Sequence, residues 1–243
     1  MVAYERFAAF YDEVMDDPGP RALRVDAAIA RFRPRAASVL ELACGTGSIL
    51  ARLTTDAALI GLDRSPRMLE VCAAKVPGAR LVEGDMRHFD LGQRFDVVVC
   101  VFDSVNHLLD PSEWVSLFDG VHRHLTEGGL FVFDVNTVGE LRRLGDEPPW
   151  VYDFEDGTAI VDVTFAESDQ GLGLTDWDIR IFERVTATRF ELHHERIGEL
   201  GLPLARVRAL LGDRFELLEE VDEDGLVATD DSVKAYYAVR RLG

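Results

Sequence analysis

Four acidic side chains stand at or just past the ends of four apolar runs in the first half of the chain: Glu41, Asp63, Asp85 and Asp103. Between residues 38 and 135 such runs alternate with helical stretches, which indicates an α/β, doubly wound, Rossmann-like parallel sheet. Ligands bind outside the carboxyl ends of the strands of such a sheet. The four carboxylates are therefore predicted to line one cleft, where carboxylate oxygens accept hydrogen bonds and attract cations.

A glycine turn stands between the first of these runs and a predicted helix start at Ser48. Gly45 and Gly47 lack Cβ atoms, so the backbone at these positions can approach a ligand closely. The binding motif for a nicotinamide dinucleotide needs a third glycine where the chain has Leu50. In addition, the carboxylate of Glu41 would repel the negative charge of a pyrophosphate. A carboxylate suits a cationic ligand better, so the turn favours the sulfonium and ammonium groups of an adenosyl cofactor.

Five sequence blocks follow one another over residues 38–137: ELACGTGS, GLDRSPRML, EGDMR, FDVVVCVFDSVNHL and GGLFVFDVNT. In this order they resemble the class I S-adenosylmethionine-dependent methyltransferases. Within that family the chain is similar to small bacterial enzymes with a β insertion after the fifth strand, a group that includes sugar-amine N-methyltransferases. The resemblance implies S-adenosyl-L-methionine as cofactor, S-adenosyl-L-homocysteine as product and a small-molecule methyl acceptor. One departure is Ala43, where the family often has a further glycine.

The predicted cofactor residues combine the local chemistry with this resemblance. Asp63 is placed at the ribose hydroxyls and Asp85 at the adenine amino group, with Met86 covering the ring. The resemblance places Tyr11 near the methionine end, although packing of this ring is an equal alternative. The full predicted set is Tyr11, Glu41, Ala43, Cys44, Gly45, Gly47, Asp63, Arg64, Met68, Gly84, Asp85, Met86, Val101 and Phe102.

Methyl transfer mainly needs alignment and exclusion of water, so no elaborate catalytic group is required. A neutral amine can lose its proton before or after the attack, whereas a general base assists a hydroxyl acceptor. His107, just after the fourth strand, is the candidate for that role. Packing or capping of this histidine in the next helix is the alternative. Asp103 and Asn106 in the same loop are predicted to orient the acceptor or the cofactor.

The composition limits the other functions. The net charge is −18, and a protein of that charge repels the phosphate backbone of nucleic acids, so we expect no nucleic-acid partner. The three cysteines lack paired spacing, and the six histidines lack ligand spacing, so no metal site is predicted. The N-terminus carries acidic residues and no long apolar region, and no run approaches a membrane span. We therefore expect a cytoplasmic protein without a membrane partner.

Three segments are predicted: residues 1–145 as cofactor-binding core with an N-terminal helical lid, 146–200 as an antiparallel β insertion, and 201–243 as a helix and strands completing the core sheet. The insertion either roofs the site or forms a homodimer contact. Other activities stay open: a protein or RNA methyltransferase, a catalytically silent cofactor-binding module, and a nicotinamide-dependent reductase. The reductase is disfavoured because neither lysine, Lys75 nor Lys234, follows a tyrosine at the spacing Tyr-x-x-x-Lys.

Overall fold

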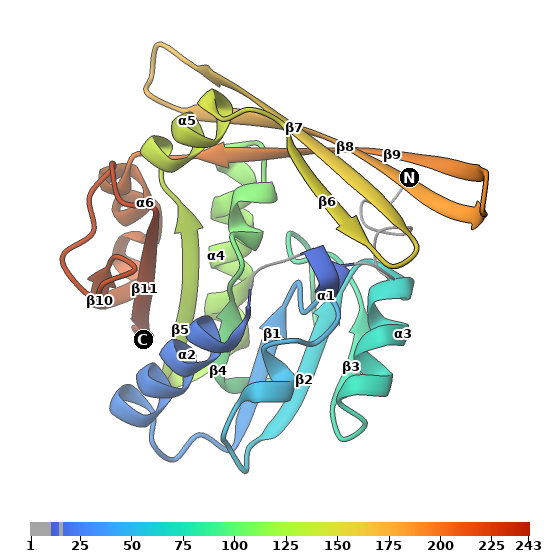
Figure 1. Cartoon of the computed structure of the whole chain (residues 1–243). Coiled ribbons are helices and arrows are strands. Elements are labelled where there is room, and N and C mark those ends of the chain that lie inside the picture. Colours follow the sequence, from blue (N-terminus) through green and yellow to red (C-terminus); the bar gives the residue numbers. More distant parts are fainter. Residues whose placement is uncertain (1–10, 15–16) are drawn as a thin grey trace.

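The computed structural model describes residues 11–14 and 17–243 and contains two β-sheets, a larger one below a smaller one (Figure 1). The larger sheet has the strand order β10-β11-β5-β4-β1-β2-β3. Its strands are β1 (Ser38–Leu42), β2 (Ala58–Asp63), β3 (Arg80–Glu83), β4 (Phe95–Cys100), β5 (Leu125–Asn136), β10 (Phe215–Val221) and β11 (Lys234–Arg241). The first five strands pair in parallel, and β11 is antiparallel to both β5 and β10. The strand order reverses at β1, so the prediction of a doubly wound α/β sheet is confirmed.

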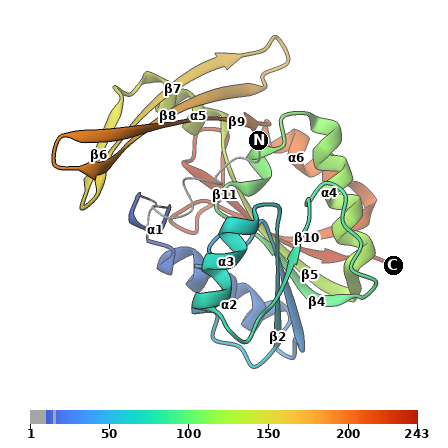
Figure 2. The same cartoon turned by 90° about the vertical axis from the view of Figure 1, so that its right-hand side faces the viewer.

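Helices cover both faces of this sheet, with α2 and α3 on one side and α4 and α6 on the other (Figure 2). Their bounds, with those of the short helices, are α1 (Tyr11–Val14), α2 (Gly19–Phe32), η2 (Leu50–Arg52), α3 (Pro66–Lys75), η3 (Ser104–His107), α4 (Pro111–His124), α5 (Val138–Asp146), α6 (Leu204–Leu211) and η4 (Gly212–Arg214).

The two layers bury both faces of the central strands, and for this reason those strands are apolar throughout rather than alternating. Leu40 and Leu42 of β1 pack into the cluster that contains Trp114 of α4. Val39, which points to the other face, joins the cluster built on Val25 of α2. The packing fixes the sheet, and with it the positions at which the loops after the strands begin.

The smaller sheet, which we call the roof sheet, lies over the carboxyl ends of the parallel strands (Figure 1). It is antiparallel in the order β6-β7-β8-β9 and follows α5 in the chain. Its strands are β6 (Trp150–Phe154), β7 (Gly157–Glu167), β8 (Gly173–Thr186) and β9 (Arg189–Gly201). The alternation that predicted these strands is visible in β8, where Ile179 and Ile181 are buried and Arg180 is exposed.

Two predicted helices, one after the glycine turn and one at the N-terminus, are shorter among the described residues than expected. The helix expected after the glycine turn is reduced to the 3₁₀ turn η2, because the backbone becomes extended at Leu53. Of the helix expected over residues 3–16, positions 1–10 and 15–16 lie outside the described residues, and α1 is the described portion. No helix among residues 11–14 and 17–243 has the length and apolar character that crossing a membrane requires.

Candidate active site

The glycine turn after β1 takes a left-handed backbone at three positions. The φ angles are +53° at Ala43, +51° at Gly45 and +75° at Gly47. A Cβ on Gly45 would meet no atom within 4 Å, whereas one on Gly47 would collide with the sulfur of Cys72. Gly45 therefore leaves room for a ligand, and Gly47 lets α3 pack against the turn. Ala43 adopts a conformation that costs a residue with a side chain roughly 1–2 kcal/mol.

Asp63 at the end of β2 is held in place by two backbone donors. Its Oδ2 accepts from the N–H of Gly45 at 2.9 Å, and its Oδ1 accepts from the N–H of Ser65 at 2.8 Å. Burial raises the pKa of Asp63, although these hydrogen bonds oppose the rise. Each carboxylate oxygen offers two lone-pair sites, so both oxygens retain capacity for a second donor. The side chain is thus oriented in advance for a ligand that presents two hydroxyl groups.

Asp85, after β3, is already paired. Arg87 grips its carboxylate in a bidentate contact, with Nη2 2.6 Å from Oδ2, and also donates from Nη1 to Glu113 at 2.7 Å. The hydrogen bonds from Arg87 lower the pKa of Asp85 despite partial burial. A ligand amino group can reach Asp85 only through the lone pairs that Arg87 leaves.

Glu41, the first acidic residue of the series in the chain, is buried on β1 with 4% of its surface exposed. Its Oε2 has no hydrogen-bond partner among the described residues. Burial and the nearby Cys72 raise the pKa of Glu41 well above its ordinary value, against a hydrogen bond from the backbone of Leu50. An unpartnered buried carboxylate oxygen is costly, and a cationic or N–H-bearing ligand would offset that cost.

Two adjoining cavities occupy the cleft. One, the roof cavity, has a volume of about 410 Å³ and reaches from Asp63 and Asp85 to Gly198 on β9. The other, the loop cavity, has a volume of about 450 Å³ and extends along the glycine turn past Glu41. Both are lined by Tyr11, Ala43, Gly45, Phe102 and Ser104. The shared residues make them one continuous cleft with the roof sheet over one end.

Most predicted residues lie on this cleft, but not all. The roof cavity is lined by Tyr11, Ala43, Gly45, Asp63, Arg64, Met68, Gly84, Asp85, Met86, Phe102 and His107. The loop cavity adds Glu41, Cys44 and Val101. Three predicted residues do not line either cavity: Gly47, Asp103 and Asn106.

Asn106 is the clearest departure from the sequence analysis, which placed it against a ligand. It is fully buried, its Oδ1 accepts from the N–H of Asn136, and its Nδ2 donates to the carbonyl oxygens of Asn136 and Leu200. These bonds join η3 to the end of β5 and to β9. The amide is occupied by the backbone, so Asn106 anchors the loop and the roof sheet instead of contacting a ligand.

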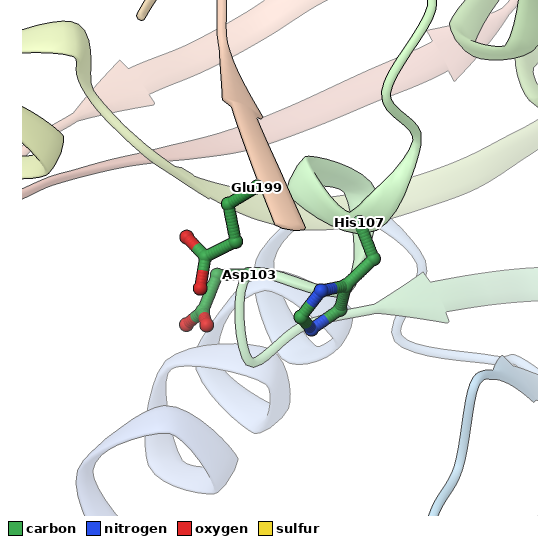
Figure 3. A group of neighbouring side chains, drawn as sticks. All are labelled: Asp103, His107 and Glu199. Atoms are coloured by element: carbon green, nitrogen blue, oxygen red, sulfur yellow. The ribbon is translucent and has the colours of Figure 1, made fainter. Parts of the chain in front are cut away.

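Asp103 belongs to a polar cluster with the half-buried His107 and the buried Glu199, in which one ligand atom of each residue lies within 4.8 Å of the others. Figure 3 shows the two carboxylates side by side, Glu199 descending from β9, with the His107 ring next to them. Asp103 has φ +50° and follows Phe102 at +61°, and its N–H donates to Asp134 at 2.7 Å. This strained turn directs the loop after β4 into the cleft.

Lys234 of β11 supplies the positive charge of this cluster. Its Nζ donates at 2.6 Å to both Asp103 and Asn136. Burial pushes the pKa of Asp103 upward, but the charges of Lys234 and Arg21 outweigh it and hold the pKa below its ordinary value. A metal ion placed here would face the Lys234 ammonium. The prediction that the chain has no metal site stays a prediction.

His107 has a defined tautomer. Its Nδ1 lies 3.2 Å from the carbonyl oxygen of Gly198, which can only accept, so Nδ1 carries the proton and the basic lone pair is on Nε2. Burial lowers the pKa of His107, although the charge of Asp103 opposes it. The ring is therefore neutral near pH 7 and borders the roof cavity, an arrangement that suits a proton acceptor.

Two members of this cluster, Glu199 and Lys234, were missed in the sequence. Burial and the charge of Asp103 raise the pKa of Glu199 to about 8, and its Oε2 accepts from Asn136 at 2.8 Å. The position of Glu199 in the alternating pattern could have identified it, because it falls two residues after Ile197, on the face of β9 that is buried. Lys234 could not be found from spacing, since it lies 131 residues from Asp103.

Comparison of the sequence with known proteins finds methyltransferases. A methyltransferase domain family matches residues 39–129. The putative methyltransferase YqeM of Bacillus subtilis (strain 168) is 30% identical over 202 residues, which cover 79% of this chain and 79% of that protein. The chain belongs to the methyltransferase family, with the fold of its class I, S-adenosylmethionine-dependent members.

The chain is also similar to a solved methyltransferase structure and to a sugar N,N-dimethyltransferase. A solved S-adenosylmethionine-dependent methyltransferase from Clostridium acetobutylicum ATCC 824 superposes over 100% of both chains with a TM-score of 0.81 at 23% identity, a likeness of fold. The dTDP-3-amino-3,6-dideoxy-alpha-D-glucopyranose N,N-dimethyltransferase of Streptomyces fradiae is 36% identical over 132 residues. That match covers 52% of each chain, so the chain spans about half the length of this relative.

Proposed function

We propose that this protein is an S-adenosylmethionine-dependent methyltransferase that methylates the nitrogen of a small amine, with amino sugars as the acceptor class. The observation that carries the proposal is the presence of two carboxylates on one cleft, Asp63 on the roof cavity and Glu41 on the loop cavity. Asp63 is pre-oriented by backbone donors, and Glu41 holds a buried oxygen without a partner. The acceptor class is supported by the similarity to the Streptomyces fradiae enzyme, whose name describes dimethylation of an amino sugar.

The residues fit the cofactor by the chemistry of their donors and acceptors. Asp63 would accept from the two ribose hydroxyls, and Asp85 would accept from the adenine amino group beside Arg87. Met68 and Met86 border the same cavity and provide polarisable surface for the ring. Glu41 would face the α-ammonium group. When bound, S-adenosylmethionine would supply a sulfonium methyl group whose carbon a nucleophile attacks in line, with S-adenosylhomocysteine as the leaving group.

The chain's own contribution to the reaction is alignment, exclusion of water and removal of one proton. The roof sheet closes the cavity beside Gly198, and Tyr11 and Phe102 border the junction of the two cavities. As the new nitrogen–methyl bond forms and the sulfur–methyl bond breaks, the amine acquires a positive charge. Nε2 of His107 would then take the surplus proton, because Gly198 keeps the other ring nitrogen protonated.

A cytoplasmic location belongs to the proposal as well. The structure has three free cysteines, all buried: Cys44, Cys72 and Cys100. Free thiols of this kind are usual in a reducing compartment.

The proposal is tested first by calorimetric titration with S-adenosylmethionine, S-adenosylhomocysteine and NADH in parallel. Micromolar binding of the first two alone supports the cofactor assignment, and binding of NADH alone contradicts it. Methyl transfer is then followed by mass spectrometry on pairs of sugars that differ only in carrying an amino or a hydroxyl group. A gain of one methyl group on the amino member alone supports N-methylation, and transfer to the hydroxyl member would contradict it.

A further inference from the structure

An ionic cluster at the mouth of the loop cavity joins three segments that are distant in the sequence. Oδ1 of Asp12 in α1 accepts from the hydroxyl groups of Thr46 at 2.6 Å and Ser48 at 2.9 Å, both in the glycine turn. Oδ2 of Asp12 accepts from Nζ of Lys75, the last residue of α3, at 2.6 Å. Lys75 also donates to the same two hydroxyl oxygens, at 3.1 and 3.0 Å.

The hydrogen bonds of the cluster favour the ionised form of Asp12. Burial works against the ionised carboxylate, but the hydrogen bonds from Lys75, Thr46 and Ser48 prevail and lower the pKa of Asp12. The side chains remain partly accessible, with 43% of Asp12 and 26% of Lys75 exposed. An ion pair of this exposure contributes little to global stability, so the cluster is poorly explained as a support of the core.

Contacts of Tyr11 and Asp12 tie the helix that carries Asp12 to the rest of the chain. α1 spans four residues, about one turn, and so short a helix is unstable unless tertiary contacts fix it. Tyr11, the residue before Asp12 in α1, lines both cavities and packs against the buried face of the roof sheet. The Asp12 contacts therefore hold the segment that carries the Tyr11 ring to the glycine turn and to α3.

We propose that Asp12 and Lys75 form a clamp that positions Tyr11 over the cofactor cleft by tying α1 to the glycine turn. Asp12 is a positioning residue, since it acts through Tyr11 and through the turn. The ligand-binding part of this inference rests on the proposed function. The clamp holds α1 beside the glycine turn, where Tyr11 borders both the loop cavity and the roof cavity.

The test is a double-mutant cycle on Asp12→Asn and Lys75→Met, read by calorimetric titration with S-adenosylmethionine and by turnover. Each single variant is expected to weaken binding by roughly 3- to 10-fold and to lower turnover, and the double variant to lose no more than either single one. The matched control is Arg67→Met, which removes another positive charge from α3; within the part of the chain that the structure describes, Arg67 forms its ion pair with exposed Glu70. It is expected to bind like the wild type, and all variants to unfold at nearly the same temperature.

A second readout needs no ligand and separates failure of the clamp from failure of the proposed function. Hydrogen exchange of the amides of residues 11–14 is expected to accelerate in both single variants and not in Arg67→Met. Additive binding losses, unchanged exchange, or tighter binding by Asp12→Asn would each overturn the clamp. The last result would mean that Asp12 competes with a carboxylate of the ligand for Lys75. If the wild type binds no adenosyl ligand, the proposed function fails, and the exchange data still decide about the clamp.

Discussion

Replacing Glu199 by Gln should make the protein more stable, and increasingly so as the pH rises. Glu199 is 3% exposed, lies beside the carboxylate of Asp103, and accepts a hydrogen bond from Asn136. Burial and the negative charge of Asp103 raise its pKa from 4.5 to about 8. Gln has the shape of the protonated carboxyl group, can accept the same hydrogen bond through its amide oxygen, and never ionises.

The magnitude follows from the proton linkage. Because the carboxyl binds its proton more tightly in the folded than in the unfolded chain, folding is penalised once the unfolded group ionises. The penalty is absent below pH 4.5, grows as the pH rises through the interval to about 8, and is constant above it. At about 1.4 kcal/mol for each tenfold change in proton affinity, the penalty reaches up to about 5 kcal/mol. Glu199→Gln removes it.

The assay is urea unfolding of the wild type and of Glu199→Gln at pH 5, 7 and 9. The difference in the free energy of unfolding is expected to be small at pH 5 and to favour the variant by several kcal/mol at pH 9. Glu191→Gln on the same strand is exposed and serves as the control. A difference that does not change with pH, or a variant less stable than the wild type at pH 9, would refute the reasoning.

Three further outcomes are expected at the cleft. Asp63→Ala should weaken binding of S-adenosylmethionine by about 1–3 kcal/mol through the lost ribose hydrogen bonds, and wild-type affinity by calorimetry would remove this residue from the site. His107→Ala should slow methyl transfer by about 100-fold with the cofactor affinity retained. Because burial holds the pKa of His107 below its ordinary value of 6.5, the acid limb of the wild-type rate profile should lie below pH 6.5 and disappear in this variant. Ala43→Gly should raise the free energy of unfolding by up to about 1 kcal/mol, since glycine adopts φ +53° without strain; a lower value in urea unfolding would contradict the strain argument.

Local patterns in the sequence predicted the fold and one side of the cleft. Apolar runs ending in acidic residues predicted the parallel strands, and the glycine turn predicted where the chain approaches a ligand. Asp63 and Glu41 were identified in this way because each lies within the motif that positions it. The antiparallel insertion was recognised from its alternation of apolar and charged residues, which a sheet with one buried face imposes.

Other assignments failed or were missed because they depend on partners far away in the chain. Asn106 has the residue type and the loop position of a ligand contact, but the backbones of Asn136 and Leu200 occupy its amide. Lys234 reaches Asp103 only because β11 pairs beside β5. The residue pattern of neither segment, taken alone, predicts the contact between Lys234 and Asp103.

The sequence by itself determined the class of fold, the positions of the core strands along the chain and the carboxylates at their ends, since hydrophobic period, glycine conformations and strand-end polarity are properties of neighbouring residues. The tertiary structure alone decided which polar groups meet. It brought Asp12 onto Lys75, Lys234 onto Asp103 and the carbonyl of Gly198 onto His107. Protonation states and unpaired atoms arise from such long-range contacts, because burial and neighbouring charge are set only when distant segments pack together.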